Sequence, residues 1–173
     1  MAFDALPARW LESANRLLEA VDLEFVPPLS ARSSTRQTDF ESAAGRNVSQ
    51  YLNEMADQSC ILGLEGEALS GLLSYCPDAV VGAIGLTPPS AYVSTVCVQP
   101  ARRRRGIAEA LYGALEANLP RPVAVATRTW STNTSHIGLL LRRGFKLALE
   151  LPNDRQPGVS TVYFRLDLEG SAQ

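Results

Sequence analysis

The stretch VCVQPARRRRGIAEALYGALEANLP, residues Val96–Pro120, joins an apolar run to four consecutive arginines, a glycine and an amphipathic pattern. The run up to Val98 is rich in apolar and β-branched residues, which is typical of a buried strand. Beyond the arginines, apolar residues recur at helical spacing, at Ile107, Ala110, Leu111, Ala114 and Leu115. This change of period predicts a strand, a loop and an amphipathic helix that ends at Pro120.

The loop between this strand and this helix is predicted to bind an anion. The first N–H groups of a helix have no intrahelical acceptor, and the helix dipole favours negative charge beside them. Gly106 allows close approach to the backbone, and the guanidinium groups of residues 102–105 add charge-assisted hydrogen bonds. A solvated basic loop is the alternative, but the flanking strand, glycine and helix favour a phosphate site. The sequence contains neither G-x-x-x-x-G-K-[ST] nor G-x-G-x-x-G, so those nucleotide-binding classes lose support.

Length and composition limit the possible classes of protein. A chain of 173 residues with 46% hydrophobic content fits one globular domain with a sizeable core. The net charge is -2, which disfavours a general nucleic-acid binder because such domains carry a basic surplus. No apolar run approaches about 18 residues, and charged residues interrupt the N-terminal segment. We therefore expect a cytoplasmic protein that binds neither membrane nor nucleic acid.

The cysteines give no sign of a metal site or a disulfide framework. Cys60, Cys76 and Cys97 are widely spaced and odd in number, and the chain has a single histidine, His136. We expect all three to be small buried side chains in strands, and we expect no bound metal. A cysteine nucleophile paired with His136 is the alternative, and nothing near Cys97 supports it.

The remaining pattern predicts alternating helices and strands. Before the arginine stretch we expect helices over 7–21 and about 46–57, an irregular segment over 24–42, a hairpin turning at 65–67 and a strand over 92–98. After it we expect a buried strand over 122–130, a helix from Asn133 to Gly144, a strand over 146–151, a polar loop over 152–160 and a half-buried strand over 161–168. This order predicts a mixed α/β domain.

The arginine stretch resembles the signature of the GNAT superfamily of N-acetyltransferases. That family carries [QR]-x-x-G-x-[GA] after a strand ending in V-x-P, and here Arg103–Ala108 follow Val98-Gln99-Pro100. The family's later segment, N-x-x-A-x-x-x-Y followed by Gly-Phe, is matched in part by Asn133 and by Gly144-Phe145. The resemblance extends from about Cys60 to the final strand, whereas no opening strand is evident before the first helix.

The resemblance implies a fold and a cosubstrate. The fold would be a central, mostly antiparallel sheet that splays between its fourth and fifth strands and is flanked by helices. Acetyl-CoA would bind in that gap, with its pyrophosphate on the loop and its pantetheine arm along the fourth strand. The N–H of Val98 would be the oxyanion donor. The cofactor-binding residues would be Val96, Val98, Arg103, Arg104, Arg105, Gly106, Ile107, Ala108 and Asn133. Asn133 is equally well explained as a helix N-cap.

The family's acid is a tyrosine, and here Leu140 stands at that position. His136 lies one turn earlier on the same helix face, so it is a candidate replacement acid or a contact to the cofactor, with protonation by water as the default. We find no clear general base, because Glu65, Glu67, Asp78 and Asp154 are expected in solvated turns or loops. Candidate acceptor-binding residues are Trp130, for which burial in the core is the favoured alternative, and Asn153, Asp154 and Arg155 in the predicted polar loop.

These observations favour an enzyme with one GNAT-like domain over residues 1–173, comprising a helical part over 1–58 and a cofactor-binding core over 59–168. Its expected activity is transfer of acetyl from acetyl-CoA to a primary amine of a small molecule, peptide or protein. A module that binds acyl-CoA without catalysis is an alternative, kept open by Leu140. A nucleic-acid-binding domain that uses the arginines is another, and it predicts affinity that falls steeply with salt. The resemblance also leaves a homodimer open.

Overall fold

The computed structural model describes residues 1–37 and 47–170. The predicted boundary at Arg46 and the end of the predicted irregular segment, residues 38–42, therefore lie outside the described residues. The chain forms two compact units, the first made of residues 1–75 and 94–118 and the second of residues 76–93 and 119–173. Strands β3 (Ala68–Pro77) and β4 (Ser90–Val98) each contribute to both units. Whether residues 1–173 act as one domain stays a prediction.

The first unit begins with a short strand that the sequence pattern did not reveal. Strand β1 (Ala2–Phe3) pairs antiparallel with β2 (Ser59–Glu65), with Ala2 opposite Ile61 and Phe3 opposite Cys60. The expectation that no strand precedes the first helix is therefore wrong. Two residues are too few to show the alternation by which a strand is recognised in sequence.

Two helices cover one face of the sheet in the first unit. Helix α1 (Leu11–Val21) follows a 3₁₀ turn at Ala8–Trp10, and helix α2 (Val48–Ala56) begins at an N-cap, Asn47, whose side chain accepts from the Gln50 N–H at 3.2 Å. Both helices were predicted. Their apolar sides meet strand residues in one core that includes Leu17, Leu18, Tyr51, Met55, Cys60, Leu62, Leu72 and Cys97. Burial of this set drives the packing of the unit.

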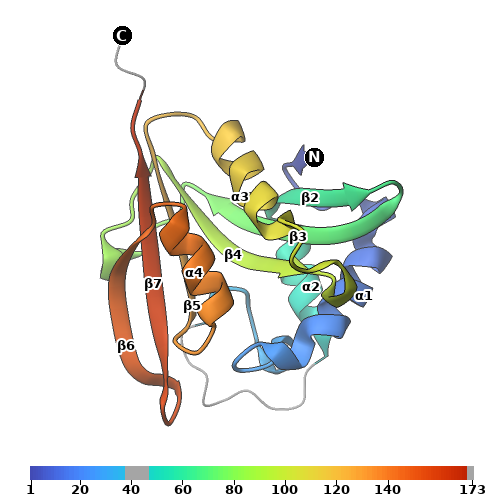
Figure 1. Ribbon diagram of the computed structural model, residues 1–173, viewed down its shortest axis with the longest axis horizontal. Coiled ribbons are helices and arrows are strands. Elements are labelled where there is room, and N and C mark those ends of the chain that lie inside the picture. The colour runs from blue at the N-terminus through green and yellow to red at the C-terminus, as the bar shows by residue number, and fades with distance from the viewer. Residues whose placement is uncertain (38–46, 171–173) are drawn as a thin grey trace. The chain divides into compact units, whose positions relative to one another are not determined.

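Helix α3 (Ile107–Asn118) packs on the opposite face, against β2 and β3 (Figure 1). The contact depends on two glycines in the hairpin. A Cβ placed on Gly71 would lie 2.8 Å from Cγ2 of Ile107, so only glycine fits beneath the start of the helix. The predicted apolar stripe is buried in part: Leu111 and Leu115 are buried, whereas Ala110 is exposed and Tyr112, outside the stripe, is fully covered.

The hydrogen-bonded order is β1-β2-β3-β4 in the first unit and β4-β5-β7-β6 in the second, which makes seven strands among the described residues. The predicted hairpin is confirmed, with β2 and β3 antiparallel around Gly66 at φ +61°. Strand β5 (Val123–Trp130) runs parallel to the first half of β4, in a ladder from Ser90 opposite Ala124 to Val93 opposite Thr127. Divergence of the two strands beyond that ladder stays a prediction. The mixed α/β class is confirmed.

The second unit closes with α4 (Thr134–Arg142) and a long hairpin of β6 (Lys146–Gln156) and β7 (Val159–Leu168). As predicted, Asn133 caps the start of α4, and Gly144, whose φ of +86° suits glycine, follows its end. The predicted polar loop over 152–160 is wrong, because residues 152–156 continue β6 through a register shift. Strand β7 is also not simply half-buried, since residues 161–164 are covered on both faces.

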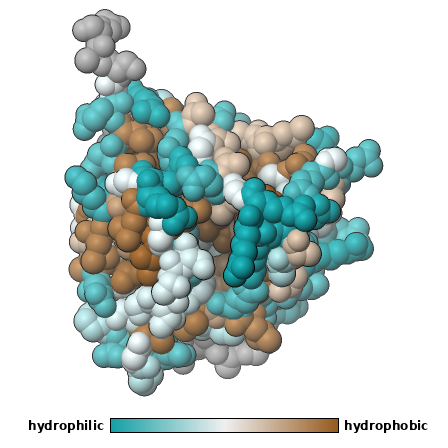
Figure 2. All heavy atoms as spheres, in the orientation of Figure 1, coloured by the Kyte–Doolittle hydropathy of each residue, from teal (hydrophilic) through white to brown (hydrophobic). Residues whose placement is uncertain are grey.

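Large exposed hydrophobic side chains are scattered over different elements, at Leu23, Val80, Leu141 and Leu147. Figure 2 likewise shows hydrophilic and apolar residues intermixed on the face it draws. In residues 1–37 and 47–170, none of the helices is long and apolar enough to cross a bilayer.

Candidate functional site

The arginine loop presents backbone N–H groups at the start of α3, within the first unit. Arg104 and Gly106 have left-handed φ values of +62° and +76°, which turn the chain sharply before the helix. The first intrahelical bond runs from the Ala110 N–H to the Gly106 carbonyl at 2.9 Å, so the N–H groups of Ile107 and Ala108 precede it. A Cβ placed on Gly106 would meet no heavy atom within 4 Å. The loop therefore fits a phosphate group that approaches Gly106.

Two glutamates form ion pairs with arginines of this loop. Arg103 pairs with Glu24 at 2.7 Å, and Glu65 pairs with Arg102 and, at 3.8 Å, with Arg105. All these side chains are about one-third to one-half exposed, so the pairs are weak and readily exchanged for another anion. The prediction that Glu65 is a solvated turn residue is wrong, because it ends β2 beside the arginines.

Strand β4 is irregular just before the predicted oxyanion donor. Ser94 hydrogen-bonds to Gln58, which follows α2, and to Ser74 at 2.9 Å, while the hydroxyl of Thr95 bonds to Tyr51 of α2 at 2.7 Å. Successive side chains of a regular strand point to opposite faces, yet both of these reach the α2 side. This is the signature of a β-bulge, a device that re-aims the residues that follow it.

Beyond the bulge, the backbone of Val98 faces away from β3. The Gln99 N–H donates to the Ser70 carbonyl of β3 at 2.9 Å, and the N–H groups of adjacent strand residues point to opposite edges. The carbonyl of Val98 shares that other edge and accepts from Arg103 Nε at 3.3 Å. Val98 thus presents its N–H away from the β3 ladder, as an oxyanion donor requires, and by the same alternation so does Val96.

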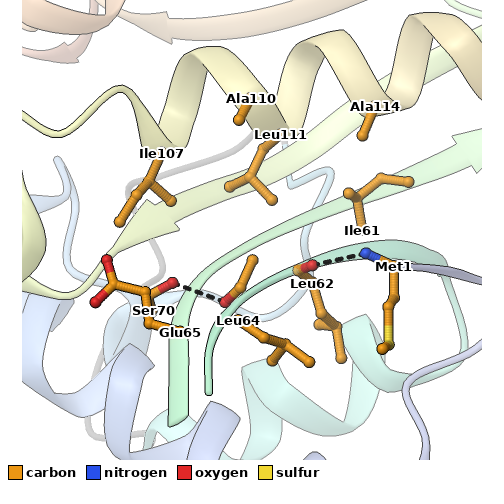
Figure 3. A pocket seen from close by; sticks show the side chains of 11 residues that line it. Met1, Ile61, Leu62, Leu64, Glu65, Ser70, Ile107, Ala110, Leu111 and Ala114 are labelled. Carbon is orange, nitrogen blue, oxygen red and sulfur yellow. Dashed lines mark hydrogen bonds between the residues drawn. The ribbon is translucent and has the colours of Figure 1, made fainter. Parts of the chain in front are cut away.

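A cavity of about 290 Å³ lies between α3 and β2 in the first unit (Figure 3). Its walls are mostly apolar, and Ile107, Ala110 and Ala114 point into it from the helix. Of the predicted site residues only Ile107 lines it. The cavity therefore explains why the predicted helix stripe is not wholly buried, and it is not the phosphate site described above.

Asn133, in the second unit, acts as an N-cap in the structure. Its Oδ1 accepts from the His136 N–H at 3.3 Å, and its Nδ2 donates to the Thr129 hydroxyl at 3.0 Å. These bonds confirm the capping role and fix the side chain at the start of α4. A contact from Asn133 to the cofactor stays a prediction of the resemblance.

His136 is poorly suited to be a cationic acid. It is half-buried in the first turn of α4, and burial lowers its pKa to about 4. The positive end of the helix dipole also disfavours a cation there. His136 is therefore neutral near pH 7 and has no imidazolium proton to give to a leaving thiolate.

The lowered pKa predicts an acid-sensitive fold. As pH falls from about 6.5 to about 4, the unfolded chain protonates this histidine and the folded protein does not, so stability is lost over that window. We expect His136→Gln to lose less stability than the parent protein over this range, as measured by urea unfolding at a series of pH values. Parallel losses in both proteins would contradict the assignment.

Leu140, at the family's tyrosine position, is fully buried. We expect Leu140→Tyr to destabilise the fold by about 2–4 kcal/mol, because it overpacks the site and buries a hydroxyl. The control is Leu141→Tyr, since Leu141 is 55% exposed and its replacement should change stability by less than about 0.5 kcal/mol. Urea unfolding measures both variants, and equal stabilities would refute this description of the site.

The predicted acceptor-binding residues lie together in the second unit. Trp130 ends β5 and is half-buried, and its register partner on β7 is Thr161. Asp154 and Arg155 both hydrogen-bond to the Thr161 hydroxyl, and Asn153 accepts from the Gly158 N–H at 2.7 Å. The last three are strand residues beside a bulge, and Arg155 is only 8% exposed. Thr161 is thus the register partner of Trp130 and the hydrogen-bond partner of both Asp154 and Arg155.

The expectation of buried cysteines in strands is confirmed for Cys60 and Cys97 and is wrong for the burial of Cys76. All three are free thiols in strands; Cys60 and Cys97 are buried and Cys76 is half-buried. Burial raises the pKa of Cys97 to about 12 and that of Cys60 to about 11, so neither is a thiolate at neutral pH. Within the described ranges we find no cluster of three or more metal-ligating side chains.

Sequence analysis missed three partners of the predicted site. Glu24 is 79 residues from Arg103, and no local pattern links the two. Thr129 and Thr161 each look like ordinary strand residues, although they orient Asn133 and Arg155. Sequence analysis also passed over Arg128, although a charged residue is unusual in a largely buried strand such as β5.

Comparisons with known proteins agree with this geometry. Residues 18–145 match the acetyltransferase (GNAT) family, and the chain belongs to that family. No curated protein matches the chain. Similar solved structures include the ribosomal-protein-S18-alanine N-acetyltransferase of Escherichia coli, at 18% identity, TM-score 0.66 and coverage of 100% of this chain and 97% of that one.

Two further structures contain the predicted cosubstrate or its product. The Salmonella typhimurium protein yncA, solved with its cofactor acetyl-CoA, is 14% identical at TM-score 0.67, with 100% and 96% of the two chains covered. An aminoglycoside 6'-N-acetyltransferase complexed with coenzyme A is 13% identical at TM-score 0.67, with 100% and 98% covered. The GNAT fold is thereby confirmed, and acetyl-CoA is confirmed as the cosubstrate of the family.

Proposed function

We propose that this protein is an N-acetyltransferase that transfers acetyl from acetyl-CoA to a primary amine of a small molecule, peptide or protein. The observation that carries the proposal is the arginine loop, in which Gly106 leaves open space beside the first N–H groups of α3. Such an arrangement suits a pyrophosphate. Membership of the GNAT acetyltransferase family supports the same activity.

Different residues of the first unit would bind different parts of acetyl-CoA. The N–H groups of residues 104–108 would hold the pyrophosphate, and the arginines would exchange Glu24 and Glu65 for phosphate oxygens. The outward backbone groups of Val96 and Val98 would pair with the pantetheine arm. Acetyl-CoA, when bound, supplies an acetyl group activated as a thioester.

For the chemical step, the N–H of Val98 would stabilise the negative charge that develops on the thioester oxygen. The amine must attack in its neutral form, so a proton has to leave it. Because His136 is neutral and the Leu140 side chain has no ionisable proton, water protonates the departing thiolate in this account. We assign no general base among the described side chains.

Calorimetric titration of acetyl-CoA into the purified protein tests the cosubstrate site. We expect one site per chain with a dissociation constant in the micromolar range. The nucleic-acid alternative is tested in parallel with short DNA and RNA at low salt, where a basic binding surface is most favoured. Absence of acetyl-CoA binding would refute the proposal, and tight salt-sensitive nucleic-acid binding would replace it.

A second candidate function is acyl-CoA binding without efficient catalysis. The observation that favours it is that a fully buried leucine, Leu140, stands at the family's tyrosine position, so this position supplies no acid. The two candidates differ in turnover. Release of free CoA thiol that requires an added amine favours the enzyme, and binding without amine-dependent release favours the binding module.

A further inference from the structure

The cavity between α3 and β2 has apolar walls and one charged end, and the proposed function assigns it no role. Gly63 of β2 and Ala110 and Ala114 of α3 are among the residues that line it. Glu65 and Ser70 lie at the end near the start of α3 (Figure 3). All the lining residues belong to the first unit, so the cavity requires nothing from the second.

The cavity is large enough for a small organic molecule and is open to solvent. Its volume is about 290 Å³, whereas an apolar protein cavity of about 150 Å³ takes up benzene. Ala110 is exposed and Ala114, one turn further along α3, is half-buried, so a ligand can enter beside the helix. Burial of an apolar chain against these walls would supply most of the driving force for binding.

The carboxylate of Glu65 is the only charged side chain among the described residues that line the cavity. Arg102 and Arg105 both approach its Oε2, the second at 3.8 Å, and Oε1 accepts no hydrogen bond from residues 1–37 and 47–170. A carboxylate can accept about four hydrogen bonds, so capacity remains for a cation. The Glu65 side chain is 33% exposed, which makes its existing ion pairs weak.

Glu65 also connects the cavity to the phosphate loop. Arg102 and Arg105 belong to that loop, and Ile107, which lines the cavity, carries one of the N–H groups that precede the first intrahelical bond. An anionic Glu65 competes with a phosphate for the two arginines. A cation that neutralises Glu65 from the cavity would therefore leave both guanidinium groups more available to a phosphate.

We propose that the cavity binds a molecule with an apolar body of about six carbons and one cationic end, and that this ligand raises the affinity of the protein for acetyl-CoA. The apolar body lies between α3 and β2, and the cationic end donates hydrogen bonds to Glu65. Binding of the cation is independent of the proposed function, whereas its effect on acetyl-CoA rests on that function. By linkage, the cosubstrate or CoA raises the affinity for the cation by the same factor.

Four probes separate the two parts of this recognition. Hexylguanidinium carries both the chain and the charge, hexan-1-ol only the chain, methylguanidinium only the charge, and hexanoate the opposite charge. Each is titrated calorimetrically into the protein in the absence of CoA. We expect hexylguanidinium to bind at one site per chain, about tenfold or more tighter than each of the others, because a charged hydrogen bond contributes on that scale. Absence of hexylguanidinium binding, or equal affinity for hexan-1-ol, would overturn the inference.

Variants of α3 place the probe in the cavity. Ala114→Leu and Ala110→Leu each fill part of the space, and each should weaken hexylguanidinium binding by about tenfold. The control is Ala117→Leu, which makes the same change at an exposed position of the same helix that does not line the cavity. Thermal unfolding confirms that each variant is folded, and the exposed position of Ala110 provides the second test if Ala114→Leu does not fold. Unchanged affinity in the folded variants would refute the site.

A variant of Glu65 tests the charged end. Glu65→Gln should lower the affinity for hexylguanidinium to about that for hexan-1-ol, because the carboxylate is lost and the shape is kept. The control is Glu67→Gln, since Glu67 is exposed in the β2–β3 turn and does not line the cavity. Equal losses in the two variants would show that a general effect of charge, and not contact with Glu65, explains the result, and would overturn the inference.

The effect on the phosphate loop is measured with CoA, which has no acetyl group to transfer. With hexylguanidinium at saturation, we expect the dissociation constant of CoA to fall about fivefold, and CoA should strengthen hexylguanidinium binding by the same factor. Glu65→Gln should abolish this coupling. Unchanged affinity for CoA beside bound hexylguanidinium would overturn the coupling. If the parent protein binds no CoA, the proposed function fails and the coupling falls with it, whereas binding of hexylguanidinium alone is still measured.

Discussion

Replacing Gly106 by tryptophan is expected to weaken acetyl-CoA binding by about 100-fold or more. The space beside Gly106 is open, and the indole would fill the place where the phosphates approach the N–H groups of α3. Two or more charged hydrogen bonds would then be lost, each contributing about 1.5–3 kcal/mol. Calorimetric titration of acetyl-CoA into both proteins measures the difference.

The control for this variant has the same backbone strain at a glycine of the other unit. Gly158, in the β6–β7 turn, has φ +80° and open space around its Cα, as Gly106 does at φ +76°. Gly158→Trp should cost similar stability through its left-handed conformation and leave acetyl-CoA affinity unchanged. Equal losses of affinity in both variants would show that strain, and not occupation of the phosphate site, explains the result.

Replacing Val98 by proline is expected to lower kcat by about 100-fold to 1,000-fold, because it removes one oxyanion-hole donor. The N–H of Val98 points away from β3, so its loss leaves the Gln99–Ser70 bond of the ladder in place. Proline is tolerated in a strand at such a position. Single-turnover acetyl transfer with saturating acetyl-CoA isolates the chemical step.

Val98→Ala is the matched variant for this experiment. It truncates the half-buried side chain and keeps the N–H, so kcat should stay close to that of the parent protein. Near-equal rates for the proline and alanine variants would contradict the role of the Val98 N–H. Both variants need an unfolding curve, since a disordered β4 would lower the rate for another reason.

The features that sequence analysis predicted are local ones. Helix α3 follows from apolar spacing, α4 from a capping Asn133 and a terminating Gly144, and the phosphate loop from a glycine between a strand and a helix. Each depends on residues within one or two turns of each other. These elements can therefore be predicted from the sequence without knowledge of tertiary contacts.

The features that sequence analysis missed depend on distant partners. Residues 152–156 look like a loop, with proline, asparagine and aspartate, yet pairing with β7 and burial of Arg155 make them a strand. Strand β1 is held by a single short pairing with β2. The ion pair of Arg103 with Glu24 and the bulge in β4 likewise arise only when separate elements meet. Tertiary context overrides local propensity at these places.

The most direct measurement is mass spectrometry of the amine after incubation with this protein and acetyl-CoA, together with the yield of free CoA. The account predicts an amine that gains one acetyl group on nitrogen, matched mole for mole by CoA, and loss of this product in Gly106→Trp. Binding of acetyl-CoA with no acetylated amine across amino acids, peptides and polyamines would contradict it and would favour the non-catalytic binding module.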